Sequence, residues 1–389
     1  MSATASARAV ARRRARPIRV LLTLFALIAG TVLAFMPAKP AHAALPDVWG
    51  YGYHDPSAPA PGPLANTLTS VGTAGQIVSA GGNSYAVLFP NVGAPQGIVH
   101  VTAIAKTGNP TPQPPSWCEP DGWSPSGPDE IIKVSCWVVA GGVAKPFPSG
   151  FAITWVSATY TGPPAADYAY AESDGLGGLI TQFDSAGAGL SPAHLGTGVY
   201  QIKLPGVGPT GSTLGGDLQV TGQAALSGVP ARCKIGAWMN AGGIQLPTIL
   251  CFDGGTGAPV DARWSLTYQF KLDVRGMPAS AWGYFWQTTG APPLTNLDSA
   301  TGWTTVTSGS VPPAGIAVAF PAIGPSATPF STATITAFGG GPGFCRLGAL
   351  GGGPPWLNSG GSLLIRSVDC FNGGGVPAAS DFFATYTAK

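Results

Sequence analysis

The stretch Tyr200-Gln-Ile-Lys-Leu-Pro205 indicates the fold class, because apolar and polar side chains alternate along it and it ends on a proline. A period of two is the pattern of a β-strand with one apolar and one polar face. Proline cannot donate a hydrogen bond to a neighbouring strand, so it marks the end of the strand. The same block recurs at residues 85–90 and 316–321, which predicts three equivalent strands.

A second block with the same alternation follows each copy of the first. Its copies read Val99-His-Val-Thr-Ala103, Leu218-Gln-Val-Thr-Gly222 and Ala333-Thr-Ile-Thr-Ala337. We expect the apolar positions to face the interior and the polar positions to form an outward face in contact with water. Those polar positions are His100, Thr102, Gln219, Thr221, Thr334 and Thr336.

Five landmarks recur in the same order in three parts of the chain: an aromatic opening, the two strand blocks, a pair of cysteines and an aromatic closing strand. Internal repetition of this kind is typical of a chain built from homologous units. We therefore predict an all-β protein of three tandem antiparallel β-sandwich-like modules, at residues 44–163, 164–276 and 277–389. These segments are called the first, second and third repeat below.

The composition agrees with short strands joined by tight turns. The 389 residues include 57 Gly and 39 Pro, a quarter of the chain, while only 9% are charged. A Gly-X-Y period is absent, which excludes collagen. Aromatic residues make up 10% of the chain, which is more than a disordered protein carries.

The first 43 residues have the three parts of a secretory signal peptide. Six arginines precede residue 20, residues 20–36 are almost wholly apolar, and Ala41-His-Ala43 is a small-x-small cleavage site. We predict a secreted protein, cut after Ala43. The alternative is an uncleaved membrane anchor, since 17 apolar residues are many for a signal core. The Arg-rich leader and the abundant Ala, Gly and Pro are typical of a high-GC Gram-positive bacterium.

Removal of this leader changes the net charge from +2 to −5, because it takes away seven cations and no acid. The remaining 12 cations and 17 acids give no basic footprint for nucleic acid. No second apolar run approaches 18 residues, so no membrane-spanning segment is expected after cleavage.

Six cysteines fall two per repeat. In an exported chain an even number indicates disulfides, and the symmetry of the repeats selects one set of pairs. The predicted disulfides, one inside each module, are Cys118–Cys136, Cys233–Cys251 and Cys345–Cys370. Free thiols and metal ligands are the alternatives, but structural metal sites usually take four clustered ligands, and no Cys-x-x-Cys is present.

No polar constellation recurs with the repeats. Beyond the leader the histidines are His54, His100 and His194, which have no histidine at the equivalent positions, and we expect all three at the surface. The adjacent acids Asp129 and Glu130 also lack counterparts. There is no Gly-x-Ser-x-Gly elbow, P-loop or dinucleotide motif, so no catalytic residue, cofactor or metal ion is predicted.

The aromatic openings are the one feature of the sequence that suggests a binding surface. Alternating trios stand at Trp49, Tyr51, Tyr53 and at Trp282, Tyr284, Trp286. On a strand each trio lines one face, which is either a core layer or a platform on which sugars or apolar polymers stack. The second repeat has Glu172 at the third position, so we expect the first two positions in the core and the third exposed. The candidate binding residues are Trp49, Tyr53, Trp282 and Trp286.

Residues 200–208, Val220-Thr221 and Cys251-Phe252 are the nearest copies of a pattern close to Tyr-x-Val-x-Phe-Pro-Gly-x-Gly, Val-x-Val-Thr-Ala and Cys-Phe. In this pattern the repeats resemble a family of secreted, largely uncharacterised actinobacterial proteins. The departures are Asn91 and Trp137 in the first repeat and Ala322 in the third. The resemblance implies export and tandem β modules, and it carries no known activity.

Repeated strands and cysteines without a repeated polar site favour an exported, non-catalytic protein. We expect it to act by binding or structural contact at the cell envelope or outside the cell, with cell-wall polysaccharide or a surface polymer as partner. The alternative is a secreted hydrolase with a site in the first repeat, built from His54, Asp129 and Glu130. Self-association stays open, and so does the choice between a rod of modules and packing about a pseudo-threefold axis.

Overall fold

The three copies of the first block form the strands that the alternation predicts. They are β5 (Ser84–Phe89), β14 (Val199–Pro205) and β23 (Gly315–Phe320). The computed structural model describes residues 47–105, 113–157, 166–277, 279, 281–288, 291–303, 306–311, 315–324, 330–348 and 354–389. In that part of the chain every regular element is a strand, apart from the short 3-10 helix η1 (Pro293–Thr295). The all-β prediction is confirmed.

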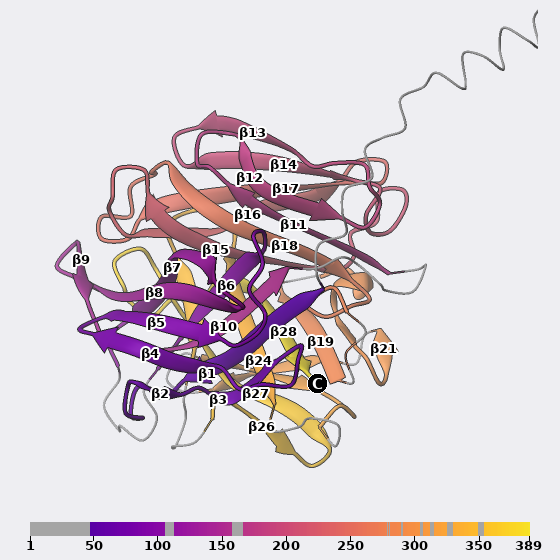
Figure 1. Cartoon of the computed structure of the whole chain (residues 1–389). Coiled ribbons are helices and arrows are strands. Elements are labelled where there is room, and N and C mark those ends of the chain that lie inside the picture. The colour runs from indigo at the N-terminus through magenta and orange to yellow at the C-terminus, as the bar shows by residue number, and fades with distance from the viewer. Residues whose placement is uncertain are drawn as a thin grey trace, which may run out of the picture. The chain divides into compact units, whose positions relative to one another are not determined.

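Hydrogen bonds join the strands into four sheets, called A to D here (Figure 1). Sheet A runs β22 (Thr307–Val311), β23, β27 (Ser362–Phe371), β25 (Phe344–Leu347), β6 (Ile98–Ile104), β10 (Gly150–Ser157), β1 (Val48–His54) and β3 (Ala65–Thr69), with β26 (Trp356–Ser359) beside β27. Sheet B runs β2 (Gly62–Pro63), β4 (Gln76–Gly81), β5, β8 (Asp129–Ala140) and β7 (Ser116–Ser126), with β9 (Val143–Pro146) beside β8.

The other two sheets hold the second repeat and the remainder of the third. Sheet C runs β12 (Leu179–Asp184), β11 (Asp167–Ser173), β18 (Ala262–Phe270) and β15 (Asp217–Ala225). Sheet D runs β13 (Ser191–Gly196), β14, β17 (Ile244–Asp253), β16 (Ala231–Asn240), β24 (Ser331–Phe338), β28 (Asp381–Ala388), β19 (Ala281–Gln287), β20 (Leu297–Asp298) and β21 (Gly302–Trp303).

Strands of different repeats share two of these sheets. In sheet A, β25 of the third repeat meets β6 of the first through the parallel bridge between Leu347 and Ile104. In sheet D, β16 of the second repeat meets β24 of the third through the parallel bridge between Ile235 and Phe338. Residues 45–389 form one compact unit. The module boundaries therefore stay predictions, and residue 163 lies outside the described part of the chain.

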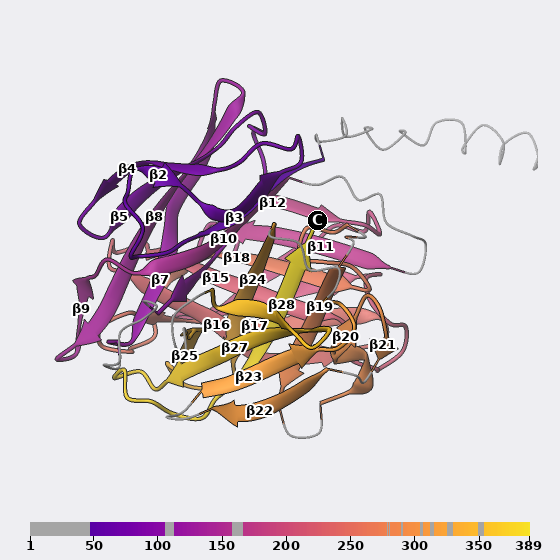
Figure 2. The same ribbon diagram turned by 90° about the horizontal axis from the view of Figure 1, so that it is seen from below.

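The first and second repeats meet through β7, which lies against β15 (Figure 2). The same contact therefore occurs three times. In each case the strand with the first cysteine of one repeat meets the second-block strand of the next repeat. The three pairs are β7 with β15, β16 with β24 and β25 with β6. This order is cyclic, so the repeats pack about a pseudo-threefold axis and do not form a rod.

The three second-block strands, β6, β15 and β24, contact one another at this axis. One threonine from each repeat accepts a hydrogen bond from a backbone N–H of a neighbouring repeat. These bonds join Thr102 Oγ1 to Ile335 N at 3.0 Å, Thr221 Oγ1 to Val101 N at 3.3 Å and Thr336 Oγ1 to Val220 N at 2.8 Å. Thr102, Thr221 and Thr336 are called the threonine ring below. Because each threonine occupies the same place in its repeat, the ring follows the cyclic order of the strands.

The prediction that the polar face of the second block is solvated is wrong. His100, Gln219, Thr334 and the threonine ring are all buried. This face is turned to the axis, where His100, Gln219 and the threonine ring form hydrogen bonds with neighbouring repeats. His100 Nε2 lies 2.7 Å from Thr267 Oγ1, and its Nδ1 lies 3.1 Å from Thr221 Oγ1.

The apolar faces of the strands form one large core per repeat. The core of the first repeat contains Phe89 and Trp155, that of the second contains Trp264, and that of the third contains Phe320 and Tyr386. All five side chains are fully buried. Burying a large apolar side chain contributes about 1.5–3 kcal/mol, so these residues contribute substantially to the stability of the cores.

Candidate functional site

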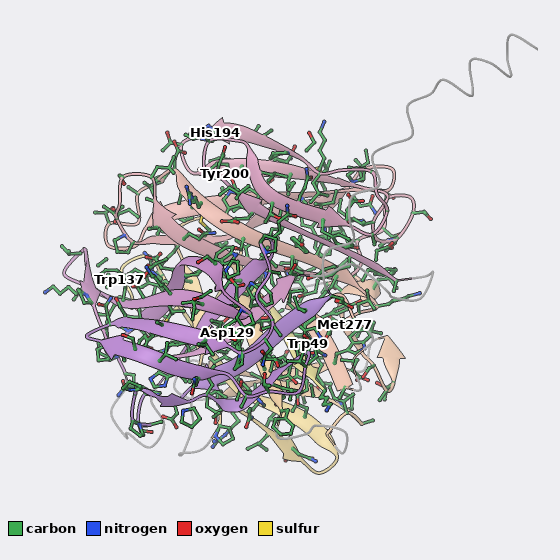
Figure 3. The ribbon with its side chains drawn as sticks, in the orientation of Figure 1. Trp49, Asp129, Trp137, His194, Tyr200 and Met277 are labelled. Atoms are coloured by element: carbon green, nitrogen blue, oxygen red, sulfur yellow. A yellow bond between two sulfur atoms is a disulfide. The ribbon has the colours of Figure 1, made fainter. Side chains whose placement is uncertain are left out.

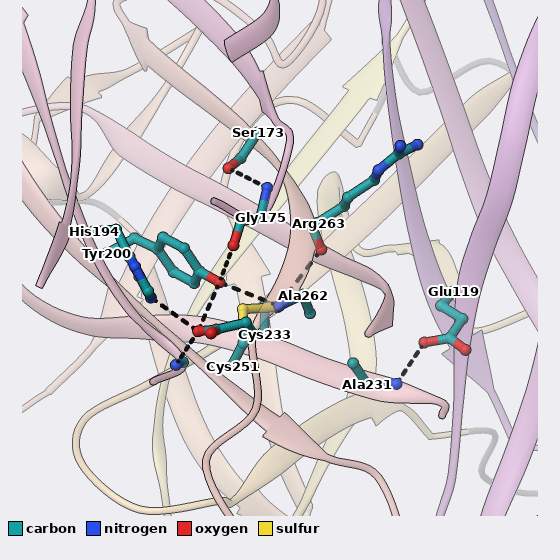
Figure 4. Close-up of a disulfide and its surroundings, with 12 residues drawn as sticks. Glu119, Ser173, Gly175, His194, Tyr200, Ala231, Cys233, Cys251, Ala262 and Arg263 are labelled. Atoms are coloured by element: carbon teal, nitrogen blue, oxygen red, sulfur yellow. Dashed lines mark hydrogen bonds and ion pairs between the residues drawn. A yellow bond between two sulfur atoms is a disulfide. The ribbon is translucent and has the colours of Figure 1, made fainter. Parts of the chain in front are cut away.

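Each predicted disulfide is present and fixes a strand that reaches the axis. The pairs join β7 to β8 (Cys118–Cys136), β16 to β17 (Cys233–Cys251) and β25 to β27 (Cys345–Cys370). The two cysteines of every pair stand directly opposite each other on neighbouring strands, with Cα atoms 4.0–4.1 Å apart. Figure 4 shows the pair of the second repeat.

The candidate binding aromatics do not form an exposed platform. Trp49, Tyr53, Trp282 and Trp286 are only 7–9% exposed. The expectation that the third position of each trio is exposed is wrong, because a tryptophan of a neighbouring repeat covers it. Trp356 packs edge-on against Tyr53 with ring centroids 5.3 Å apart, and Trp238 packs against Trp286 at 5.8 Å.

The first positions of the trios are covered in a different way. Trp49, which Figure 3 labels, stacks on Tyr51, and the guanidinium group of Arg275 lies over its ring, 4.3 Å from the centroid. Trp282 stacks on Tyr284 with ring centroids 5.8 Å apart. These aromatic residues therefore belong to the core, as expected for the first two positions of each trio.

In the second repeat the third position of the trio is not an aromatic ring covered by a tryptophan. Glu172 of β11 stands at the third position in the second repeat, and Trp123 of β7 stands five residues after Cys118, as Trp238 does after Cys233. Here Trp123 has no aromatic partner at the third position and is only half-buried. Together with Glu172 it lines a cavity of about 280 Å³, which we call the Trp123 groove.

Four further side chains give the Trp123 groove its chemistry: Ile180 and Thr181 of β12, Gln223 of β15 and Arg263 of β18. Gln223 Nε2 donates to Glu172 Oε1 at 3.4 Å. Burial raises the pKa of Glu172, and the Gln223 hydrogen bond and the Arg263 charge oppose that shift. Among the described residues the buried Thr181 hydroxyl has no hydrogen-bond partner. The groove thus offers a carboxylate, an amide, a hydroxyl and a guanidinium beside an indole ring.

The histidines are dispersed. The surface position predicted for His54 is wrong: it is buried between the rings of Tyr85 and Phe151, at centroid distances of 5.0 and 5.5 Å, and burial lowers its pKa to about 4. The surface position predicted for His100 is wrong for the reason given above, that its strand faces the axis. His194 is exposed, as expected.

The structure brings His194 to Asp261, a pairing that the sequence did not indicate. His194 Nε2 lies 2.9 Å from Asp261 Oδ1, which also accepts hydrogen bonds from the Gly198 N–H and the Tyr200 hydroxyl (Figure 4). The Tyr200 ring stacks on the imidazole. These contacts tie the hairpin of β13 and β14 to the start of β18, which is a structural task.

The acids of the first repeat are likewise bound to backbone groups. Asp129 accepts a hydrogen bond from the Asn91 N–H at 2.9 Å, and Glu130 accepts one from the Ala94 N–H at 3.2 Å. Burial raises the pKa of Glu130 to about 7, although the Ala94 bond opposes the shift. Within the described residues no hydrogen bond or ion pair joins His54 to either acid. His54, Asp129 and Glu130 thus each have their own contacts, with aromatic rings or with backbone N–H groups.

Comparison of the chain with protein-family models found no match, and comparisons with curated proteins and with solved structures found none either. In the described part of the chain no group of three or more His, Cys, Asp or Glu side chains could hold a metal ion. Nor does any helix described there have the length and hydropathy to cross a membrane.

The sequence alone did not indicate the Trp123 groove, because its lining comes from five strands of two repeats. One signal pointed toward it. Glu172 replaces an aromatic residue that the other two repeats keep, and such a replacement is compatible both with exposure and with a cavity.

Proposed function

We propose that this is an exported, non-catalytic binding protein that holds a saccharide unit of a cell-envelope or extracellular polymer in the Trp123 groove. One observation carries the proposal. Two of three equivalent interfaces are closed by a tryptophan against an aromatic ring, and the third leaves a cavity where Glu172 replaces the ring.

The chemistry of the groove favours a sugar. A pyranose has an apolar C–H face that stacks on an indole ring and hydroxyl groups at its edge that both donate and accept hydrogen bonds. The Glu172 carboxylate accepts, the Arg263 guanidinium donates, and the Gln223 amide and Thr181 hydroxyl do both. Because Glu172 and Arg263 offset each other in charge, the groove suits an uncharged ring. Its volume is close to the lower end of the range of ligand sites, about 300–1,000 Å³.

The scaffold supports the same conclusion. The lining strands belong to sheets with large buried cores, and Cys118–Cys136 fixes the strand that carries Trp123. A site held on rigid strands loses little conformational entropy on binding. Three disulfides are typical of a protein that folds outside the cytosol, in agreement with the predicted leader.

Calorimetric titration with chitotetraose, cellotetraose and mannotetraose tests the proposal. We expect saturable binding of one oligosaccharide class by the native protein. Trp123→Ala should weaken it at least tenfold, because the stacking surface is lost; tenfold corresponds to about 1.4 kcal/mol. Leu195→Ala is the matched control, since Leu195 is an exposed apolar residue on β13, outside the groove.

Glu172→Gln separates stacking from hydrogen bonding at nearly constant volume. We expect it to weaken the same oligosaccharide without abolishing binding. The groove is not the binding site if Trp123→Ala leaves the affinity at the level of Leu195→Ala. The proposed function fails if the native protein binds none of the three oligosaccharides.

A further inference from the structure

A second cavity lies on the pseudo-threefold axis beside the threonine ring, and all three repeats line it. Its other walls include the first cysteine of each disulfide, Cys118, Cys233 and Cys345, and the preceding residues Trp117, Arg232 and Phe344. This axial cavity has a volume of about 50 Å³. A single water needs about 10–15 Å³ on this measure, so the cavity has room for several oxygen atoms.

Arg232 is the first unusual residue of the axial cavity. It is only 5% exposed, and its guanidinium group lies over the ring of Trp117 at 5.0 Å and over that of Phe344 at 4.3 Å. Its Nη2 donates to the Gly373 carbonyl at 3.1 Å. Its Nε and Nη1 have no hydrogen-bond partner in the part of the chain that the structure describes. Unsatisfied donors of a buried cation are costly, so a ligand that accepts from them is strongly favoured.

Lys234 is the second unusual residue, and it is only 3% exposed. No hydrogen bond or ion pair of its ammonium group is found among the described residues. The acids whose charges act on the two cations already accept other bonds. Asp253, which acts on Arg232, accepts from two backbone N–H groups, and Asp381, which acts on Lys234, accepts from the Thr288 hydroxyl.

The equivalent positions of the other repeats are satisfied by the protein itself. Glu119, Lys234 and Arg346 each follow the first cysteine of a repeat. Glu119 accepts a hydrogen bond from the Ala231 N–H at 2.9 Å (Figure 4). Arg346 donates to the Ser116 hydroxyl at 3.0 Å and to the Pro114 carbonyl at 2.6 Å. Lys234 alone lacks such a partner, and it shares its cavity with the donors of Arg232.

We propose that the axial cavity binds a free inorganic oxyanion of the size of phosphate or sulfate, held by Arg232 and Lys234. Two cations line the cavity and no acidic side chain does. A bound oxyanion accepts hydrogen bonds from both side chains and offsets their mutual repulsion. The cavity is separate from the Trp123 groove, with which it shares no lining residue. The inference therefore does not depend on the proposed function.

Titration calorimetry with sodium sulfate, in chloride buffer of constant ionic strength, tests the site. We expect one saturable site per chain. Lys234→Met, which keeps the length of the side chain, should weaken sulfate binding at least tenfold. Lys203→Met is the matched control, because Lys203 is an exposed lysine on β14, and it should bind sulfate as the native protein does.

Proton uptake gives a second readout that needs no variant. Burial and the Arg232 charge lower the pKa of Lys234 to about 8, and a bound anion favours the charged amine. Binding of sulfate, which does not titrate in this range, should therefore take up a proton at pH 8.5 and almost none at pH 6.5. The other charges that act on the amine are those of Arg232, whose pKa burial lowers to about 10, and of Asp381 of β28.

Calorimetry in two buffers of different ionisation enthalpy measures this uptake. The site is refuted if the native protein binds neither sulfate nor phosphate, or if proton uptake at pH 8.5 is absent. Binding of glycerol 3-phosphate without binding of either inorganic anion would overturn the assignment to a free oxyanion. If Lys234→Met does not fold, the proton uptake of the native protein still decides.

Discussion

Replacing Thr336 by Val removes one hydroxyl of the threonine ring and keeps the shape of the side chain. Thr336 Oγ1 accepts from the Val220 N–H at 2.8 Å and lies 3.0 Å from Gln219 Oε1, to which it donates. In the variant the Val220 N–H stays buried and loses its partner. An unsatisfied buried donor costs about 1–3 kcal/mol, and the lost Gln219 bond adds about 0.5–1.5 kcal/mol at most. We expect the free energy of unfolding to fall by about 1–4 kcal/mol.

Thr334→Val is the matched control. Thr334 lies on the same strand and is 1% exposed, but its hydroxyl has no hydrogen-bond partner among the described residues. Its replacement should leave stability unchanged or raise it, because no bond is lost and a buried polar atom is removed. Denaturant unfolding with the disulfides intact measures both variants. If Thr336→Val unfolds at the same denaturant concentration as Thr334→Val, the threonine ring does not hold the repeats together.

Three more outcomes follow from the same structure. Replacing Cys233 and Cys251 together by Ala should lower the free energy of unfolding by about 2–4 kcal/mol, since a loop of 18 residues is released; a smaller change in denaturant unfolding would contradict the entropic argument. Acidification from pH 6.5 to 3 should destabilise the protein through His100, whose pKa burial lowers to about 3, because the unfolded chain takes up the proton first. A His100→Gln variant should show a flatter stability curve over this range, and an unchanged curve would assign the effect to other groups. The intact mass of the exported protein should match a chain that begins at Ala44 and should rise by six hydrogen masses on reduction; a mass that includes the leader would favour the membrane anchor.

Local pattern was sufficient for the strands and the disulfides. Tyr200, Ile202 and Leu204 alternate with polar residues in the sequence, and all three are buried as that alternation predicts. The cysteine pairs could be chosen because each repeat places its two cysteines at equivalent points. The strand prediction needs only one repeat and the pairing needs the comparison of all three, but neither depends on how the repeats pack against one another.

The groups that pack against a strand face could not be predicted from the sequence in the same way. A period of two tells which side chains share a face, but it does not tell whether that face meets water or another polar face. His100 and Gln219 therefore looked solvated although they are buried at the axis. The same reason explains Tyr53, whose cover is Trp356 from the other end of the chain. The two cavities are also assembled from several repeats, so no single stretch of sequence could indicate them.

The bridge between Leu347 and Ile104 has a consequence for the order of events during synthesis. A ribosome releases the N-terminal end first, so β6 has an uncovered edge until β25 has been made. Open strand edges pair readily with other chains, and the first repeat alone would carry this hazard. Sheet A is therefore complete only after the third repeat has been synthesised. Late closure of this kind suits a polypeptide that is threaded unfolded through a membrane before it folds, as the proposed export requires.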